Sequence, residues 1–107
     1  MKLHLKATSI DLTEPLKIYI DEKLGGIEKF VERWDMEGAV EIWIEVGRTT
    51  RHHKKGDVFR AEADLRLPGK VLRAEEEDFD LRVAIDRVRD KLKREIERYK
   101  EVQDEHR

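Results

Sequence analysis

The segment from residue 55 to residue 86 leaves this chain few choices of fold. From residue 59 onward every second residue is apolar, which is the period of a strand with one buried face. These apolar residues are Phe59, Ala61, Ala63, Leu65 and Leu67. Pro68 and Gly69 fit the central positions of a type II turn, because proline sets the first φ and glycine supplies the positive φ of the second. We therefore expect a strand over 59–67, a tight turn, and a returning strand over about 70–77.

The same alternation occurs in two earlier segments, 2–8 and 39–46, and predicts two more strands. Their apolar positions are Leu3, Leu5 and Ala7 in the first and Val40, Ile42, Ile44 and Val46 in the second. Trp43 falls on the opposite face of the second strand. An exposed tryptophan there could stack on a base, but packing along the sheet is the more common arrangement.

Apolar residues at helical spacing predict two amphipathic helices, over 14–33 and 79–101. Their apolar faces are Leu16, Ile20, Leu24, Ile27 and Val31 in the first and Leu81, Ala84, Ile85, Val88, Leu92, Ile96 and Tyr99 in the second. Thr13 is the expected N-cap of the first helix, with Pro15 in its first turn. The pair at 25–26 is Gly-Gly, and each glycine costs about 1 kcal/mol relative to alanine in a helix interior. We expect a kink or close packing there, and Trp34 as an anchor against the sheet.

The order β-α-β-β-β-α predicts an α+β fold, a four-stranded sheet with two helices packed on one face. A right-handed crossover would make the strands at 2–8 and 39–46 parallel. With 107 residues the chain can bury one core but not two. We expect one domain over 1–101 and a short flexible tail at 102–107. No apolar run is long enough to span a membrane or to act as a signal peptide, so a cytosolic protein is expected.

Motifs for catalysis and for metal binding are missing from the sequence. It contains no cysteine, which removes disulfides and thiolate chemistry. Ser9 is the only serine, and no glycine-rich phosphate loop occurs. The pair His52-His53 lacks the third ligand that a zinc site needs. The acidic run at 75–80 could hold magnesium, but a solvated loop before a helix N-terminus is the more common role. We expect no enzyme activity, no cofactor and no metal.

Basic and acidic residues nearly balance, at 23 Lys plus Arg against 25 Asp plus Glu, but they lie in separate blocks. Residues 48–55 contain four basic residues, two histidines and no acid. Because no neighbouring acid can neutralise this block, we favour contact with nucleic acid. The additional candidate RNA contacts in it are Arg51, Lys54 and Lys55.

On a helical wheel the predicted helix at 79–101 has two basic edges, separated by an acidic ridge. Arg87, Lys91, Arg94 and Arg98 form one edge, Arg82, Arg89, Lys93 and Lys100 the other, and Asp86, Asp90 and Glu97 the ridge. Such edges can bind a phosphate backbone. They can also extend over the boundary of the core and pair with acids one turn away. The pattern alone leaves both interpretations open and slightly favours pairing with acids within the helix over binding of phosphate.

Three stretches of the chain resemble one known family and together cover nearly all of it. They are IDLTEPLKIYIDEKLGGIEKF, HKKGDVFRAEADLRLPGKVLRAEEED and LRVAIDRVRDKLKREIERYK. LPGK, the acidic link, AID and DKL at these spacings are similar to the bacterial ribosome hibernation-promoting factors, also called ribosome-associated translation inhibitors. Since the chain ends soon after its last predicted helix, it resembles the short form of that family or the N-terminal domain of a long form.

This resemblance implies a cytoplasmic translation inhibitor, with no enzyme activity, that binds the small ribosomal subunit and its rRNA. Such a protein would fill the channel for mRNA and tRNA, compete with both, and be a monomer in solution. Carried over by position, the resemblance points to rRNA contacts on both helices. They are Lys23, Lys29, Lys91, Arg94 and Arg98, and Arg87 joins them on the same edge.

Two other functions remain open. One is a generic double-stranded RNA-binding module, whose order α-β-β-β-α is similar, although the leading strand and the LPGK-AID series argue against it. The other is a protein-interaction domain that uses the edges of the helices. Basic residues at RNA-facing positions on both helices are expected only for the ribosome-binding function.

Overall fold

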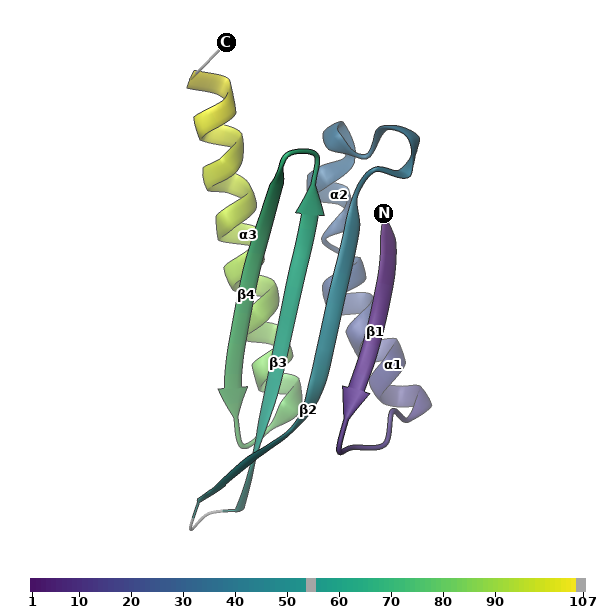
Figure 1. Ribbon diagram of the computed structural model, residues 1–107, viewed down its shortest axis with the longest axis vertical. Coiled ribbons are helices and arrows are strands. Elements are labelled where there is room, and N and C mark those ends of the chain that lie inside the picture. Colours follow the sequence, from purple (N-terminus) through teal and green to yellow (C-terminus); the bar gives the residue numbers. More distant parts are fainter. Residues whose placement is uncertain (54–55, 106–107) are drawn as a thin grey trace.

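The computed structural model describes residues 1–53 and 56–105, without the side chains of residues 50–53. Its four strands lie in the order β1-β2-β3-β4 (Figure 1). They are β1 (Lys2–Thr8), β2 (Glu41–His53), β3 (Gly56–Leu67) and β4 (Lys70–Asp78). β1 and β2 are parallel and the other neighbours are antiparallel. The predicted α+β fold, its strand order and the parallel pair are confirmed.

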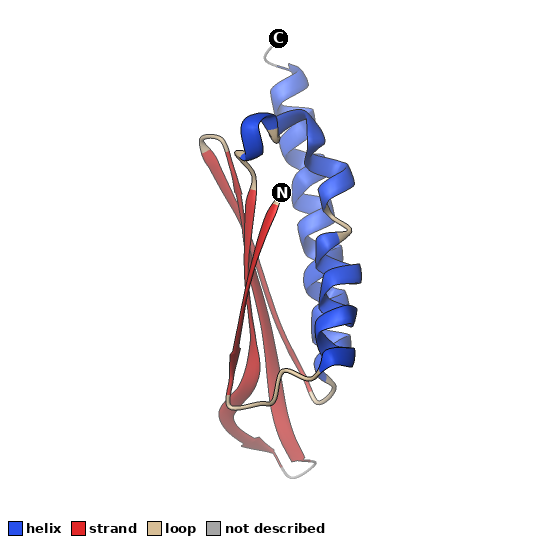
Figure 2. Ribbon diagram, turned by 90° about the vertical axis from the view of Figure 1, so that its right-hand side faces the viewer, coloured by secondary structure: helices blue, strands red, loops and turns tan. Residues whose placement is uncertain are grey.

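The helices form a second layer that covers one face of the sheet (Figure 2). The first helical segment consists of α1 (Glu14–Ile20), a π-helical turn (Asp21–Gly25), α2 (Glu28–Val31) and a 3₁₀ turn (Glu32–Trp34). A second 3₁₀ turn (Met36–Gly38) and the long helix α3 (Leu81–Glu105) complete the set. The Thr13 hydroxyl accepts a hydrogen bond from the Leu16 N–H, as expected of the N-cap.

The predicted helix over 14–33 is broken at its glycine pair. The π-helical turn ends at Gly25, and Gly26 lies between it and α2. A Cβ atom at Gly26 would come within 2.7 Å of the Glu22 carbonyl oxygen, closer than real Cβ atoms come. Only glycine therefore fits this break without a shift of the backbone.

The core lies between the two layers and is entirely apolar among the described residues. The strands contribute alternate residues to it, and the helices contribute one stripe each, as their periods predicted. Its largest fully buried side chains are Ile20, Leu24, Ile27, Ile42, Leu65, Ile85, Leu92 and Ile96. Truncating a buried leucine or isoleucine to alanine costs about 2–5 kcal/mol, so these residues hold the helices at a set position on the sheet.

The last helix, expected over 79–101, continues as far as Glu105 into the segment expected to be a flexible tail. The Trp34 indole N–H donates to Gln103 Oε1 at 2.8 Å, and the Trp34 and Tyr99 rings are 5.3 Å apart. Trp34 therefore anchors the last turns of α3, whereas the sequence predicted that it would be an anchor against the sheet. The helix extends because a tertiary contact stabilises its end.

The expected acidic loop at 75–80 is mostly strand. Residues 75–78 pair with β3, in a register that joins Glu62 to Glu75 and Phe59 to Asp78. Only Phe79 and Asp80 lie between β4 and α3. Asp80 caps the helix, since its carboxylate accepts a hydrogen bond from the Arg82 N–H at 2.9 Å.

β2 and β3 are longer than predicted and continue beyond their neighbours. The pairing of β1 with β2 ends at Thr8 and Gly47, and that of β4 with β3 ends at Asp78 and Phe59. The rest of the β2-β3 hairpin projects from the body of the protein (Figures 1 and 2). Within residues 1–53 and 56–105, no helix combines the length and apolar character needed to cross a bilayer.

Candidate nucleic-acid interface

Two helical segments, residues 14–34 and α3, lie next to each other on the sheet and run in the same direction (Figures 1 and 2). Three aromatic rings of the first segment each lie near one cation of their own segment and one cation of α3. The pairs are Lys23 and Arg82 at Tyr19, Lys29 and Lys93 at Phe30, and Arg33 and Lys100 at Trp34. We call these nine residues the seam.

The distances in the seam are those of cation–π contacts. Each charged group lies between 4.9 and 5.9 Å from the centre of its ring. Such a contact contributes about 0.5–1 kcal/mol at an exposed site. A ring attracts a cation without neutralising its charge, so the seam holds its cations in place and leaves their charge available.

The cations in the middle of the seam and those that come from α3 are the ones least compensated by neighbouring carboxylates. The described part of the chain gives no ion pair for Lys29, Arg82, Lys93 or Lys100. Lys23 lies 3.7 Å from Asp86 and Arg33 lies 3.4 Å from Asp104. The seam is therefore a row of cations between two parallel helices, of the kind that suits a phosphate backbone.

Tyr19 joins the two helical segments through its hydroxyl group. The hydroxyl donates to Asp86 Oδ1 at 2.5 Å. Burial is the larger cause and this hydrogen bond to a carboxylate the second, and together they raise the pKa of Tyr19 to about 12. Tyr19 is thus protonated at neutral pH and fixes the start of the seam.

The opposite flank of α3 faces β4 and has different partners. Arg87 lies 3.1 Å from the Asp78 carboxylate. Lys91 lies 3.1 Å from the Glu76 carboxylate and donates to the Glu75 carbonyl oxygen at 3.2 Å. These two cations are neutralised within the domain, because the even-numbered residues of β4 point toward the helices.

Among the described residues, the remaining two cations of this flank have no ion pair with β4. Arg98 pairs at 3.2 Å with Glu95 of the same helix. Arg94 is exposed, and the described residues give it no ion pair. The structure thus brings the predicted residues Lys23 and Lys29 together in the seam. It places Arg87, Lys91, Arg94 and Arg98 on another flank.

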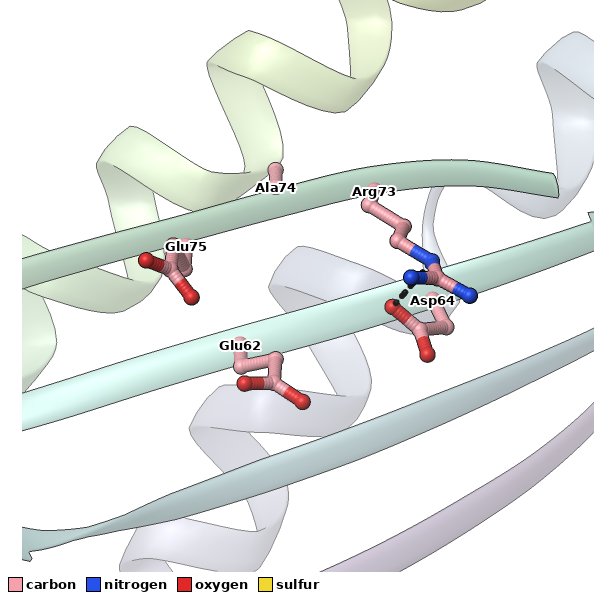
Figure 3. A pocket seen from close by; sticks show the side chains of 5 residues that line it. All are labelled: Glu62, Asp64, Arg73, Ala74 and Glu75. Atoms are coloured by element: carbon pink, nitrogen blue, oxygen red, sulfur yellow. Dashed lines mark ion pairs between the residues drawn. The ribbon is translucent and has the colours of Figure 1, made fainter.

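The open face of the sheet is covered by ion pairs between strands. Arg73 lies 3.6 Å from Asp64, its cross-strand partner, at the edge of a shallow hollow of about 240 Å³ that Glu62 and Glu75 also line (Figure 3). Arg60 contacts both of these glutamates. Such ladders stabilise a sheet and compensate the charges of Arg60 and Arg73.

Trp43 also lies on this open face and is 40% exposed. Its ring stacks on His4 at 3.8 Å, and the Arg66 guanidinium lies 4.8 Å from the ring centre. The favoured packing along the sheet is thereby confirmed. Among the described residues, no three histidine, aspartate or glutamate side chains are grouped as a metal site requires.

The other predicted RNA contacts are Arg51, Lys54 and Lys55. Lys54 and Lys55 are outside the described residues, and so is the side chain of Arg51. Arg48, at the base of the hairpin, lies 3.3 Å from Asp57.

The list of predicted contacts lacks part of the seam. Arg82, Lys93 and Lys100 were recognised as one edge of the last helix but were not chosen as contacts. Arg33, Tyr19 and Phe30 were not singled out, and Trp34 was expected only as an anchor against the sheet. The sequence did contain a signal for the rings of the seam, namely the spacings of four residues in Tyr19–Lys23 and Phe30–Trp34. Residues four apart share one helix face.

These features define a class of protein, a small two-layer α+β domain with a cationic helical face that suits a polyanion. The chain belongs to the family described as Sigma 54 modulation protein / S30EA ribosomal protein, whose model matches residues 3–103. The resemblance found in the sequence is thereby confirmed.

The relatives include proteins named for ribosome hibernation. The chain is 29% identical to a ribosome hibernation promotion factor of Deinococcus radiodurans, over 90% of this chain and 47% of that protein. It is also 29% identical to a ribosome hibernation promoting factor of Pseudomonas putida, over 96% of this chain and 90% of that protein. It thus spans about half of the first relative and most of the second.

Two solved structures have the same fold. The N-terminal domain of Thermus thermophilus Protein Y has a TM-score of 0.73 and 27% identity, over 92% of this chain and 99% of that one. A ribosomal subunit interface protein of Coxiella burnetii has a TM-score of 0.75, over 94% of this chain and 98% of that one. At 20% identity this second structure supports the fold alone.

Proposed function

We propose that this chain binds the small ribosomal subunit in the cytoplasm and inhibits translation there without catalysis. On this proposal it contacts rRNA and fills the channel for mRNA and tRNA, so that it competes with both. Membership of the S30EA family and the names of the relatives support ribosome binding.

The observation that carries the proposal is the seam. Its cations come from two helices and lie over aromatic rings, and four of them have no ion pair among the described residues. Contacts of this kind are made to phosphates and depend on shape and charge, with no base code. We propose Lys29 and Lys93 as the central contacts and Lys23, Arg82 and Lys100 as their neighbours.

The predicted contacts on the β4 flank form a second group. Arg94 and Arg98 are exposed, and we propose that they add to the attraction of the helical face. Arg87 and Lys91 would contribute less, since their charge is compensated by β4. Arg51, Lys54 and Lys55 remain proposed contacts at the hairpin.

Co-sedimentation with small ribosomal subunits over a salt series tests this proposal. Each phosphate contact steepens the slope of log K against log salt by about 0.7–0.9, so a seam that makes several contacts should bind tightly at low salt and weakly at high salt. Cell-free translation should be inhibited at the same protein concentrations. Absence of binding at low salt would refute the proposal.

A competition experiment tests the position on the ribosome. Small subunits loaded beforehand with mRNA and tRNA should bind the protein less than empty subunits do. Equal binding to loaded and empty subunits would place the site outside the channel.

A further inference from the structure

One carboxylate lies inside the cationic seam. Asp86 Oδ1 accepts the Tyr19 hydroxyl at 2.5 Å and lies 3.7 Å from the Lys23 ammonium group. Arg82 is one helical turn away from Asp86, and its guanidinium lies 5.2 Å from the Tyr19 ring. The Asp86 side chain is 43% exposed, so it faces solvent in the place where a phosphate would approach these two cations.

The other acids of the expected ridge on α3 differ from Asp86. Among the described residues, Asp90 has an ion pair only with the neighbouring Arg89, at 3.5 Å, and Glu97 has none. Neither acid lies against a cation of the first helical segment. The described residues give Lys29 and Lys93, which lie at Phe30 in the middle of the seam, no ion pair with a carboxylate.

We infer that Asp86 acts as an internal counter-ion of Lys23, and that it competes with RNA phosphate at the Tyr19 end of the seam, where Arg82 also lies. A phosphate at these cations would lie within a few ångströms of the carboxylate, where two like charges repel even at high effective permittivity. The Tyr19 end of the seam therefore binds RNA less tightly than its cations alone would. Binding is thereby kept weaker and more reversible, and Lys29 and Lys93 become the main anchor.

The charge of Asp86 can be separated from its structural role. The Tyr19 hydroxyl needs only an oxygen acceptor, and the amide of asparagine supplies one at the same position. Asp86→Asn therefore removes the charge and retains an acceptor. Tyr19→Phe does the opposite, since it removes the hydroxyl and leaves the charge.

This inference rests on the proposed RNA binding, and its test measures affinity for two probes, small ribosomal subunits and a synthetic oligouridylate, over a salt series. Asp86→Asn should bind both about threefold more tightly at low salt, with a slope steeper by about one phosphate contact. The control Glu101→Gln removes one acid from the same helix, and the described residues give that acid no ion pair. It should change affinity less than twofold. Tyr19→Phe retains the Asp86 charge and should therefore not reproduce the gain in affinity of Asp86→Asn.

Two results would overturn the counter-ion role. Asp86→Asn could bind no more tightly than Glu101→Gln, or it could bind more weakly while its unfolding midpoint is unchanged, in which case Asp86 only positions Lys23. Tighter binding of oligouridylate by Asp86→Asn without any association of the wild type with ribosomes would retain the inference and refute the proposed function.

If the Asp86→Asn protein does not fold, a second measurement tests the inference with other variants. In the wild-type background, Lys23→Gln should weaken binding less than twofold, because Asp86 already occupies Lys23. Lys29→Gln should weaken it about threefold, the effect of one phosphate contact. Equal losses in the two variants would overturn the inference independently of Asp86→Asn.

Discussion

The two flanks of α3 carry four basic residues each, but their neighbours differ. On the flank toward the first helical segment, three of the four cations lie over aromatic rings. On the flank toward β4, Arg87 and Lys91 each lie 3.1 Å from a carboxylate. A ring orients a cation and preserves its charge, whereas a carboxylate cancels it. The charge available to a ligand is therefore set by the element packed beside the helix.

The alternation of β4 is the cause of this difference. Leu72 and Ala74 are buried beneath α3. Glu76 and Asp78 are the next two residues on the same face of β4. These carboxylates lie at the edge of the core, where they meet the first half of α3. The first helical segment presents rings at the corresponding place on the other flank.

The largest expected effect tests the aromatic side of this comparison. Trp34→Ala should lower the free energy of unfolding by about 2 kcal/mol, less than the ~3–5 kcal/mol of a fully buried aromatic because Trp34 is only half buried. Hydrogen exchange should also show fraying of α3 beyond Tyr99. Arg98→Ala, on the β4 flank at a similar level of the helix, is the matched control and should change stability little. Similar losses in both variants would contradict the anchoring role of Trp34.

Removal of two cations from each flank compares their binding directly. Lys29→Gln with Lys93→Gln should weaken ribosome binding about tenfold at moderate salt and flatten the salt slope by about two contacts. Arg87→Gln with Lys91→Gln should weaken it less than threefold, because these charges are already compensated. Both double variants remove the same charge from the chain. If they lost the same affinity, net charge would explain binding and the seam would not.

Removal of the acids of β4 should make the second flank resemble the first. Glu76→Gln with Asp78→Asn frees Lys91 and Arg87, and we expect about threefold tighter binding and a steeper salt slope. Each lost ion pair should lower stability by less than about 1 kcal/mol, since the pairs are partly exposed. Glu37→Gln with Glu101→Gln, which removes two exposed acids elsewhere, is the control. An unchanged affinity would mean that the β4 flank faces away from the RNA.

The smallest expected effect concerns the start of the seam and depends on pH. The pKa of Tyr19 in the folded protein, about 12, lies above the ordinary value of 10. The protonated hydroxyl therefore contributes stability that is complete below pH 10 and is lost as the pH rises through about 12. Alkaline unfolding of the wild type and of Tyr19→Phe should converge over this interval, and tyrosinate absorbance of the wild type should show a component near pH 12 that Tyr19→Phe lacks. Absence of that component from the wild type would contradict the Tyr19–Asp86 contact.

Much of the fold was predictable because its signals are local. Alternation gave the strand β1, the Pro-Gly turn gave β4 nearly to the residue, and helical spacing identified the stripe from Leu81 to Tyr99 that faces the core. Burial imposes these periods on each element separately. The extension of α3 to Glu105 was missed, since it depends on a contact with Trp34, which is distant in the sequence.

The candidate site was predictable only in part. Lys23 and Lys29 were selected through the family resemblance, and both lie in the seam. The helical wheel separated the two basic edges of α3 correctly, but it could not show which edge would lie beside the rings. A wheel describes one helix and contains nothing about its neighbours.

The amino-acid sequence by itself determined the elements, their order, the residues of the core and the family of this protein. These follow from periodicity and from motifs, which are properties of short segments. The tertiary structure alone decided which cations keep their charge and that Asp86 lies among them. Charges interact according to their distance in space. Packing brings Lys23, Tyr19 and Asp86 together from two helices that the strands β2, β3 and β4 separate in the sequence.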